Sequence, residues 1–110
     1  MAKKLDAKFP GAEKHEISLR EAHQHIRRHK KNPLHPNHHG GSFDRAAIDK
    51  ILAQPGCRRL RYYHGRDKKG KPNLILVGVD AAGKDMTKAS IMERSGNCPP
   101  DCDRTSKLLA

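Results

Sequence analysis

Apolar residues recur at helical spacing in two stretches of the chain, which predicts two helices. The first is expected over residues 19–31, with a narrow apolar stripe and a capping box that begins at Ser18. The second is expected from a Ser42 cap to about residue 53, with a broader apolar face and a Pro-Gly dipeptide after it. The first helix should therefore lie mostly at the surface, and the second should pack on a core.

Two strands are expected after the second helix. The strand expected over residues 57–64 has Leu60 and Tyr62 on one face and Arg59, Arg61 and Tyr63 on the other. A polar turn with Gly70 connects it to an apolar run over 74–79. This return strand is apolar on both faces, so a hairpin with one face open to water would not bury it. The second face of this strand would be covered by residues 86–94, as a third strand or short helix, or by a second copy of the chain.

These elements predict an α+β fold in which two helices pack on an antiparallel β-hairpin. The α+β domain is expected over residues 17–96, after a flexible basic arm over 1–16 and before a cysteine-containing tail over 97–110. Only 35% of the residues are hydrophobic and there is no tryptophan, so the core should be thin. We therefore expect stability to depend on a metal ion, on a homo-oligomer, or on both.

Positive charge dominates the chain, with 23 Lys and Arg against 12 Asp and Glu. The excess lies before Ala81, because residues 81–110 carry five positive and four negative side chains. Such a field attracts nucleic acid, anionic lipid headgroups or acidic proteins, although solubility alone is a simpler explanation. The candidate polyanion-binding residues form three clusters: Arg27, Arg28, Lys30 and Lys31; Arg58, Arg59 and Arg61; Lys68, Lys69 and Lys71.

Aromatic side chains lie beside the second basic cluster. Single-strand nucleic-acid binding adds stacking rings to positive charge, and Tyr62 and Tyr63 are the candidates for that role. Two rings are few for a stacking surface, and the chain has no established DNA- or RNA-binding signature. Any such binding should be non-specific and sensitive to salt.

The cysteines suggest a metal site. Cys98 and Cys102 are separated by three residues on a proline-stiffened turn, and Cys57 is the natural third ligand for a zinc ion. His64, a loop histidine or an acidic side chain could supply the fourth ligand. The same spacing also fits inert thiols, a redox pair or an intermolecular link.

The histidines offer a second candidate metal site. His25 and His29 stand four residues apart on the first predicted helix, and Glu21 lies one turn earlier on the same face. This face could hold a divalent ion. A solvated basic helix surface is the simpler interpretation.

One stretch matches the pattern of a phosphate-binding loop. Residues 78–84 fit G-x-x-x-x-G-K, but Asp85 stands where such loops need Ser or Thr and would repel a phosphate. We therefore expect a simple turn closed by Gly83. No arrangement of nucleophile and base is visible either, so the sequence identifies no enzymatic reaction.

The sequence also bears on location. The N-terminal residues include no apolar segment of the kind a secretory signal needs, and the run over 74–79 is too short to span a bilayer. We therefore expect a cytoplasmic protein without membrane insertion. Thiols stay reduced in that compartment, so free thiols or metal ligands are expected before disulfides.

Short motifs between Ser42 and Cys102 resemble those of a group of small uncharacterised bacterial proteins. That group has a Gly-Cys strand, a Val-Gly-Val-Asp strand and a C-terminal Cys-Pro-Pro-x-Cys motif, and the likeness covers about half of the chain. The resemblance implies no activity, but it implies that the three cysteines act together. The matching residues here are Phe43, Pro55-Gly56-Cys57, Leu60-Arg61-Tyr62-Tyr63, Leu76-Val77-Gly78-Val79-Asp80, Gly83, Asp85-Met86, Cys98-Pro99-Pro100 and Cys102.

Taken together, these patterns favour a non-enzymatic binding or assembly protein. Its basic surface would contact nucleic acid or an acidic partner, and a cysteine cluster would stabilise it. Two alternatives stay open. One is a structural protein that forms homo-oligomers or filaments through its apolar strand, and the other is a thiol redox protein.

Overall fold

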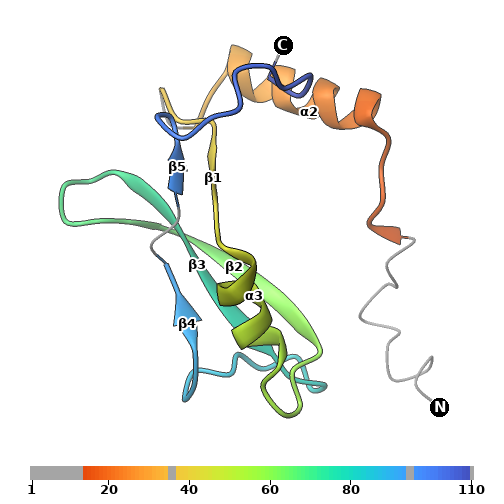
Figure 1. The fold of residues 1–110 in the computed structure, drawn as a ribbon, viewed down its shortest axis with the longest axis vertical. Coiled ribbons are helices and arrows are strands. Elements are labelled where there is room, and N and C mark those ends of the chain that lie inside the picture. Colours follow the sequence, from red (N-terminus) through yellow and green to blue (C-terminus); the bar gives the residue numbers. More distant parts are fainter. Residues whose placement is uncertain (1–13, 35–36, 94–95, 110) are drawn as a thin grey trace. The chain divides into compact units, whose positions relative to one another are not determined.

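The computed structural model describes residues 14–34, 37–93 and 96–109. The chain, shown as a ribbon in Figure 1, divides into two compact units. The first unit contains the residues up to Leu34 together with those from Asp103 onward, and the second unit is His35–Cys102. Most of the predicted basic arm lies outside the described residues, so the division into arm, domain and tail stays a prediction.

The first unit contains helix α2, Leu19–Lys31, which confirms the first predicted helix. The Ser18 hydroxyl accepts a hydrogen bond of 3.0 Å from the Glu21 backbone amide, as the capping pattern requires. No residue of α2 is buried. Its last turn is basic, which suits the negative end of the helix dipole, and Lys30 Nζ donates to the Leu109 carbonyl at 2.8 Å.

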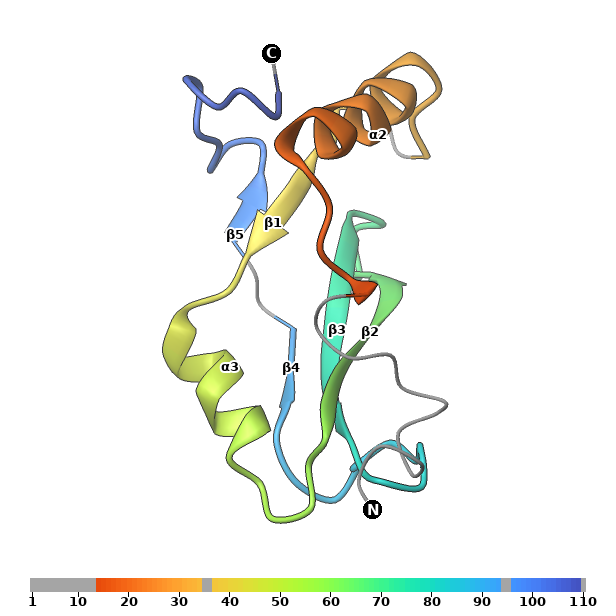
Figure 2. The same ribbon diagram turned by 90° about the vertical axis from the view of Figure 1, so that its right-hand side faces the viewer.

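The second unit contains a three-stranded antiparallel sheet with β3 (Pro72–Val79) between β2 (Arg59–Arg66) and β4 (Ile91–Met92). The β2–β3 hairpin is the predicted one, and Arg59 lies opposite Val79 in its register. Figure 2 shows the short β4 alongside β3, so the third strand considered for residues 86–94 is present. The apolar strand is therefore central and has neighbours on both edges.

A second sheet in the same unit was not expected from the sequence. Strand β1 (Gly40–Ser42) pairs antiparallel with β5 (Gly96–Cys98), and Figure 1 shows the two side by side. The prediction that Ser42 caps a helix is wrong, because Ser42 lies in β1. Helix α3 is Arg45–Leu52, and Asp44 stands at its N-cap without a side-chain cap bond.

Helix α3 packs on the β2–β3 hairpin through Ile51, whose exposed fraction is 0%. The strand residue beneath it is Gly78, where an added Cβ would lie 3.3 Å from Ile51 Cγ2 and 2.9 Å from Cys57 Sγ. The buried apolar side chains of the described residues are few, which agrees with the thin core expected from composition. They are Ile51, Leu76, Val77, Val79 and Cys98.

The α+β class is confirmed, but the expected arrangement of two helices on a single hairpin is wrong. Helix α3 packs on the hairpin, whereas α2 belongs to the other unit. The narrow apolar stripe of α2 explains the difference, because a helix that buries no residue contributes little to a core. No helix among the described residues is long and apolar enough to cross a membrane.

Candidate functional site

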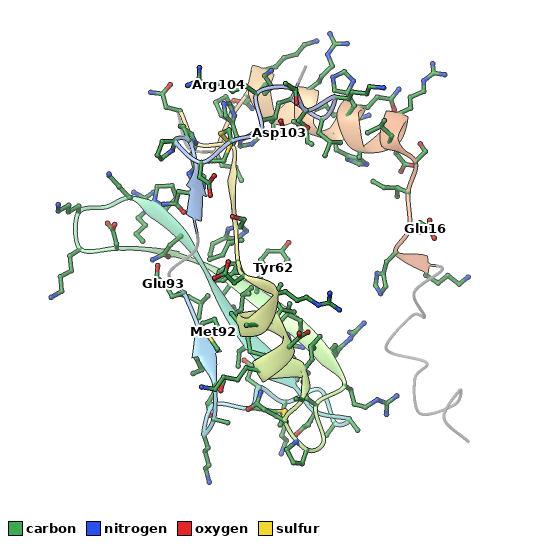
Figure 3. The ribbon with its side chains drawn as sticks, in the orientation of Figure 1. Glu16, Tyr62, Met92, Glu93, Asp103 and Arg104 are labelled. Carbon is green, nitrogen blue, oxygen red and sulfur yellow. A yellow bond between two sulfur atoms is a disulfide. The ribbon has the colours of Figure 1, made fainter. Side chains whose placement is uncertain are left out.

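Strand β2 presents different side chains on its two faces. Cross-strand partners share a face, so Leu60, Tyr62 and His64 lie on the face of their partners Gly78, Leu76 and Leu74. The Cβ position at Gly78 points toward Ile51, so this is the face that α3 covers in part. Tyr62 nevertheless stays 60% exposed (Figure 3).

The turn that joins β2 to β3 is held by Asp67. Its carboxylate oxygen Oδ1 accepts hydrogen bonds of 2.9 Å from the backbone amides of Lys69 and Lys71. The Asp67 amide donates to the Lys71 carbonyl, and the Gly70 amide donates to the Asp67 carbonyl. Gly70 has a φ of 83°, which glycine adopts without a steric penalty. Asp67 is therefore the donor or the acceptor in each of these four hydrogen bonds.

Four cationic side chains surround this turn: Arg66, Lys68, Lys69 and Lys71. We call them the basic hairpin tip. All four residues are exposed, and none forms an ion pair with an acidic side chain in the described part of the chain. The only acid in the turn is Asp67, whose Oδ1 is already engaged by backbone amides. The tip thus carries four positive charges against one negative charge.

The chain contains a second turn of the same construction after β3. Asp80 Oδ1 accepts from the amides of Ala82 and Lys84 at 2.9 Å, and the Gly83 amide donates to the Asp80 carbonyl. This confirms the predicted turn closed by Gly83, whose φ is 84°. Both turns follow the pattern Asp-x-x-Gly-Lys, with Lys-Lys in the first and Ala-Ala in the second. The lysines at positions 68 and 69 are therefore not needed to form the turn.

The predicted cluster of Arg58, Arg59 and Arg61 is less accessible to a ligand than the tip. Arg61 Nη1 lies 2.7 Å from Asp85 Oδ1, and the Tyr63 hydroxyl donates to the other carboxylate oxygen. The pKa of Asp85 is lowered from its ordinary value, first by the hydrogen bond from Tyr63. Desolvation, the next largest effect, opposes this shift, and the hydrogen bond and charge of Arg61 add to it. Arg58 and Arg59 also have interaction partners within the chain.

The cysteines are arranged differently from the expected cluster. Cys98 and Cys102 form a disulfide with their Cα atoms 4.9 Å apart, so the expectation of thiols or ligands before disulfides is wrong for this pair. The physical reason is a tight turn in which the Asp101 amide donates to the Asn97 carbonyl. Cys57 is a free, half-buried thiol that lies against Gly78 and donates to the Arg59 carbonyl at 3.5 Å.

Metal binding by the cysteines or histidines finds no preformed site in the described ranges. They contain no group of three or more His, Cys, Asp or Glu side chains placed to hold one ion. His25 lies 3.6 Å from Glu21 and 3.3 Å from Arg28, and His64 packs edge-to-face on Tyr62. Zinc binding by Cys57, Cys98 and Cys102, or metal binding by His25, His29 and His64, stays a prediction.

The remaining basic cluster lies on α2 in the first unit. Arg27, Arg28, Lys30 and Lys31 occupy the last part of that helix. The Lys30 ammonium is bound to the Leu109 carbonyl, and the Arg28 guanidinium contacts the His25 ring. This cluster is therefore partly engaged by its own unit, unlike the basic hairpin tip.

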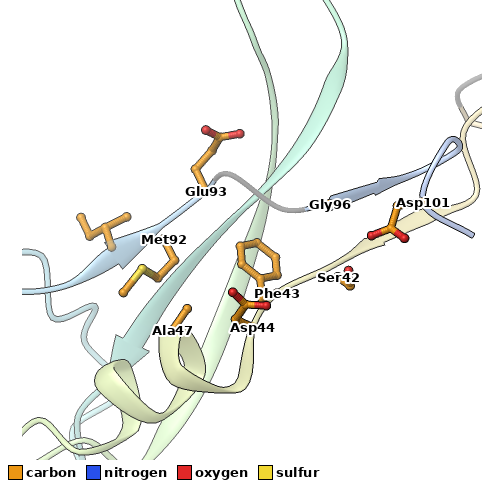
Figure 4. A pocket seen from close by; sticks show the side chains of 9 residues that line it. Ser42, Phe43, Asp44, Ala47, Met92, Glu93, Gly96 and Asp101 are labelled. Atoms are coloured by element: carbon orange, nitrogen blue, oxygen red, sulfur yellow. The ribbon is translucent and has the colours of Figure 1, made fainter.

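Sequence reasoning missed an acidic pocket of about 630 Å³ in the second unit (Figure 4). Its carboxylates are Asp44, Glu93 and Asp101, and Glu93 accepts a 3.1 Å hydrogen bond from Asn73 Nδ2. The lining residues come from four elements and their flanks, so no local motif could have indicated the pocket. They are Ser42, Phe43, Asp44, Ala47, Ile91, Met92, Glu93, Gly96 and Asp101. This surface repels anions.

Comparison with known proteins identifies no relative of this chain. No family model, curated protein or solved structure matches the chain. The resemblance of the segment between Ser42 and Cys102 to small bacterial proteins stays a prediction. Conclusions about function therefore depend on the geometry of the chain itself.

Proposed function

We propose that this is a non-enzymatic binding protein whose basic hairpin tip contacts the phosphates of nucleic acid. One observation carries the proposal. Arg66, Lys68, Lys69 and Lys71 are exposed together on one turn, and no acidic side chain of the described residues pairs with them. Their charges are therefore available to an anionic ligand.

Phosphate neutralisation has a measurable consequence. Each phosphate that a cation neutralises releases condensed counterions, so affinity falls linearly with salt on logarithmic axes. Four contacts to a single strand correspond to a slope of about −3, at about −0.7 for each contact. We expect modest affinity without strong sequence preference, because phosphate contacts carry no direct base information.

Exposed aromatic rings favour nucleic acid over an acidic protein as the partner. Tyr62 and Tyr63, 60% and 46% exposed, precede the tip on the same strand. Rings beside unpaired cations are the combination that single-strand binding uses, because every base has a face that can stack. An acidic protein would use the cations but would give these rings no comparable role.

The strand pairing of β3 supports the self-assembly alternative less than it supports the binding function. That alternative required an unpaired apolar strand, but β3 pairs with β2 along Pro72–Val79 and with β4 at Leu76 and Val77. The edge strands of this sheet are β2 and the two-residue strand β4. A second β2 placed antiparallel about its midpoint would bring Arg59 opposite Arg66, and such like-charged pairs are unfavourable.

The experiment replaces Lys68 and Lys69 by alanine. The Asp80 turn already has alanines at the matching positions, so this K68A/K69A variant should keep its fold. Anisotropy of a labelled oligonucleotide, measured across salt concentrations, should show weaker binding and a slope reduced by about 1.4. A control adds Ala81→Lys and Ala82→Lys to the same variant, which restores net charge in the other turn.

Two results would contradict the proposal. The first is the absence of binding to any oligonucleotide at low salt. The second is full recovery of affinity in the charge-restored control, because binding would then follow net charge and not the hairpin tip.

A further inference from the structure

One face of β2 carries a row of three side chains that ends at the basic hairpin tip. Tyr62, His64 and Arg66 are two residues apart in a strand, so they lie on one face at intervals of about 7 Å. All three are exposed. Among the described residues, β2 is an edge strand with a neighbour on one side only. The row is therefore open to a ligand along the sheet edge.

The Tyr62 side chain is exposed, and its hydroxyl, unlike that of Tyr63, is not held by a hydrogen bond within the described ranges. The hydroxyl of the neighbouring Tyr63 is bound to Asp85, whereas no hydrogen bond of the Tyr62 hydroxyl occurs within the described ranges. The Tyr62 ring meets the His64 ring edge-to-face, with centroids 5.6 Å apart and an interplanar angle of 86°. This contact places the edge of one ring against the face of the other and leaves Tyr62 60% exposed.

The row ends in the cations that hold phosphates in the proposed function. Arg66 is both the last member of the row and the first residue of the basic hairpin tip. A strand whose phosphates lie at the tip can place its unpaired bases along Tyr62 and His64. A duplex cannot do so, because its bases are stacked and paired inside the helix.

We infer that Tyr62, supported by His64, is a base-stacking site that makes the protein prefer single-stranded over duplex nucleic acid. This inference rests on the proposed function, since the tip must first hold the phosphates. Beyond the proposed function, the inference names single-stranded nucleic acid as the ligand and Tyr62 as the residue that selects it.

Intrinsic fluorescence gives a direct test. The chain has two tyrosines and no tryptophan, so Tyr63→Phe leaves Tyr62 as its only tyrosine fluorophore. A single-stranded oligonucleotide should quench this fluorescence at saturation. Inorganic polyphosphate, which has charge but no bases, and a duplex of the same length should quench it little. Circular dichroism checks that Tyr63→Phe, which loses the bond to Asp85, is still folded.

Affinities of two Tyr62 variants give a second test that does not depend on Tyr63. Tyr62→Ala should weaken single-strand binding about 5- to 150-fold, the range for loss of one stacked base. Tyr62→Phe should retain most of the affinity, and duplex and polyphosphate affinities should stay unchanged in both variants. Leu60→Ala, on the same face and farther from the tip, serves as the matched control.

The outcomes separate the inference from the function it rests on. If polyphosphate quenches as strongly as the oligonucleotide, or if Tyr62→Ala leaves the ratio of single-strand to duplex affinity unchanged, the stacking site is overturned. The tip could still bind phosphates in that case, and K68A/K69A would still lower affinity. If no polyanion binds at low salt, the proposed function itself fails.

Discussion

Arg61 on β2 and Asp85, which follows the Asp80 turn, form an ion pair with 2.7 Å between Nη1 and Oδ1. Asp85 also forms an isolated bridge with Val79, at the end of β3. The pair therefore ties the edge strand to the segment that returns toward β4. Its side chains are partly exposed, at 36% and 26%, so water screens the interaction without removing it.

Asp85 should make stability sensitive to acid. Its pKa in the folded protein is lowered, chiefly by the hydrogen bond from Tyr63 and then by Arg61. A carboxylate of this kind stabilises the fold above its ordinary pKa of 3.8, and the contribution is lost as pH falls through the lower folded value. Asp85→Asn should therefore lower stability at neutral pH and flatten its dependence on pH below about 4. Urea unfolding at several pH values measures both effects.

A suitable control for that series is Asp44→Asn. Asp44 lines the acidic pocket, and its carboxylate forms no ion pair with the other described residues. Identical pH profiles for the Asp85 and Asp44 variants would show that the contacts of Asp85 do not stabilise the fold.

Gly78 should tolerate no side chain. A Cβ at this position would lie 2.9 Å from Cys57 Sγ and 3.0 Å from Gln54 Nε2, beneath the buried Ile51. Gly78→Ala should cost roughly 1–3 kcal/mol of unfolding free energy, because the overpacking exceeds the entropic gain of alanine. Gly40→Ala is the control, since nothing lies within 4 Å of its Cβ position, and its effect should stay within about 0.5 kcal/mol. Equal effects in urea unfolding would contradict the packing of α3 on β3.

The Cys98–Cys102 disulfide should determine how many thiols of the protein react before and after reduction. Unfolded under non-reducing conditions, the protein should titrate one thiol, that of Cys57, and after reduction it should titrate three. Because Cys98 and Cys102 are only four positions apart, reduction should cost roughly 2 kcal/mol or less in the chain-entropy account. Cys57→Ser should leave no reactive thiol before reduction. Three thiols in air-oxidised protein would argue against the disulfide.

Removing the negative charge of Asp67 should strengthen binding. Asp67→Asn keeps an oxygen that can accept from the amides of Lys69 and Lys71, so the turn should persist. One fewer negative charge near the phosphates should raise oligonucleotide affinity about two- to fivefold at low salt. Asp80→Asn is the matched control, because Asp80 makes the same bonds in the other turn. An equal gain in both variants would indicate a general charge effect.

Local patterns predicted the local parts of this fold. Helix α2 follows from its capping residues and spacing, and the hairpin follows from alternation and from a glycine placed for positive φ. The basic hairpin tip is contiguous in the sequence, so its cluster of lysines could be recognised directly. Its availability could not, because the engagement of Arg61 by Asp85 depends on residues 24 positions apart.

Nonlocal pairing accounts for what the sequence did not predict. Strands β1 and β5 are three residues each and include glycines, so neither has a strand pattern of its own. Their pairing removed Ser42 from the expected cap and created part of the acidic pocket. The spacing of Cys98 and Cys102 fitted several chemistries, and only their positions in the turn distinguish a disulfide.

The central claim is that the basic hairpin tip contacts nucleic-acid phosphates. Its most direct test is an NMR titration of the full-length ¹⁵N-labelled protein with a short single-stranded oligonucleotide at low salt. The account predicts that amide shift changes concentrate on residues 62–71 and leave the Asp80 turn nearly unchanged. Changes confined to α2, or spread evenly over all basic residues, would contradict it.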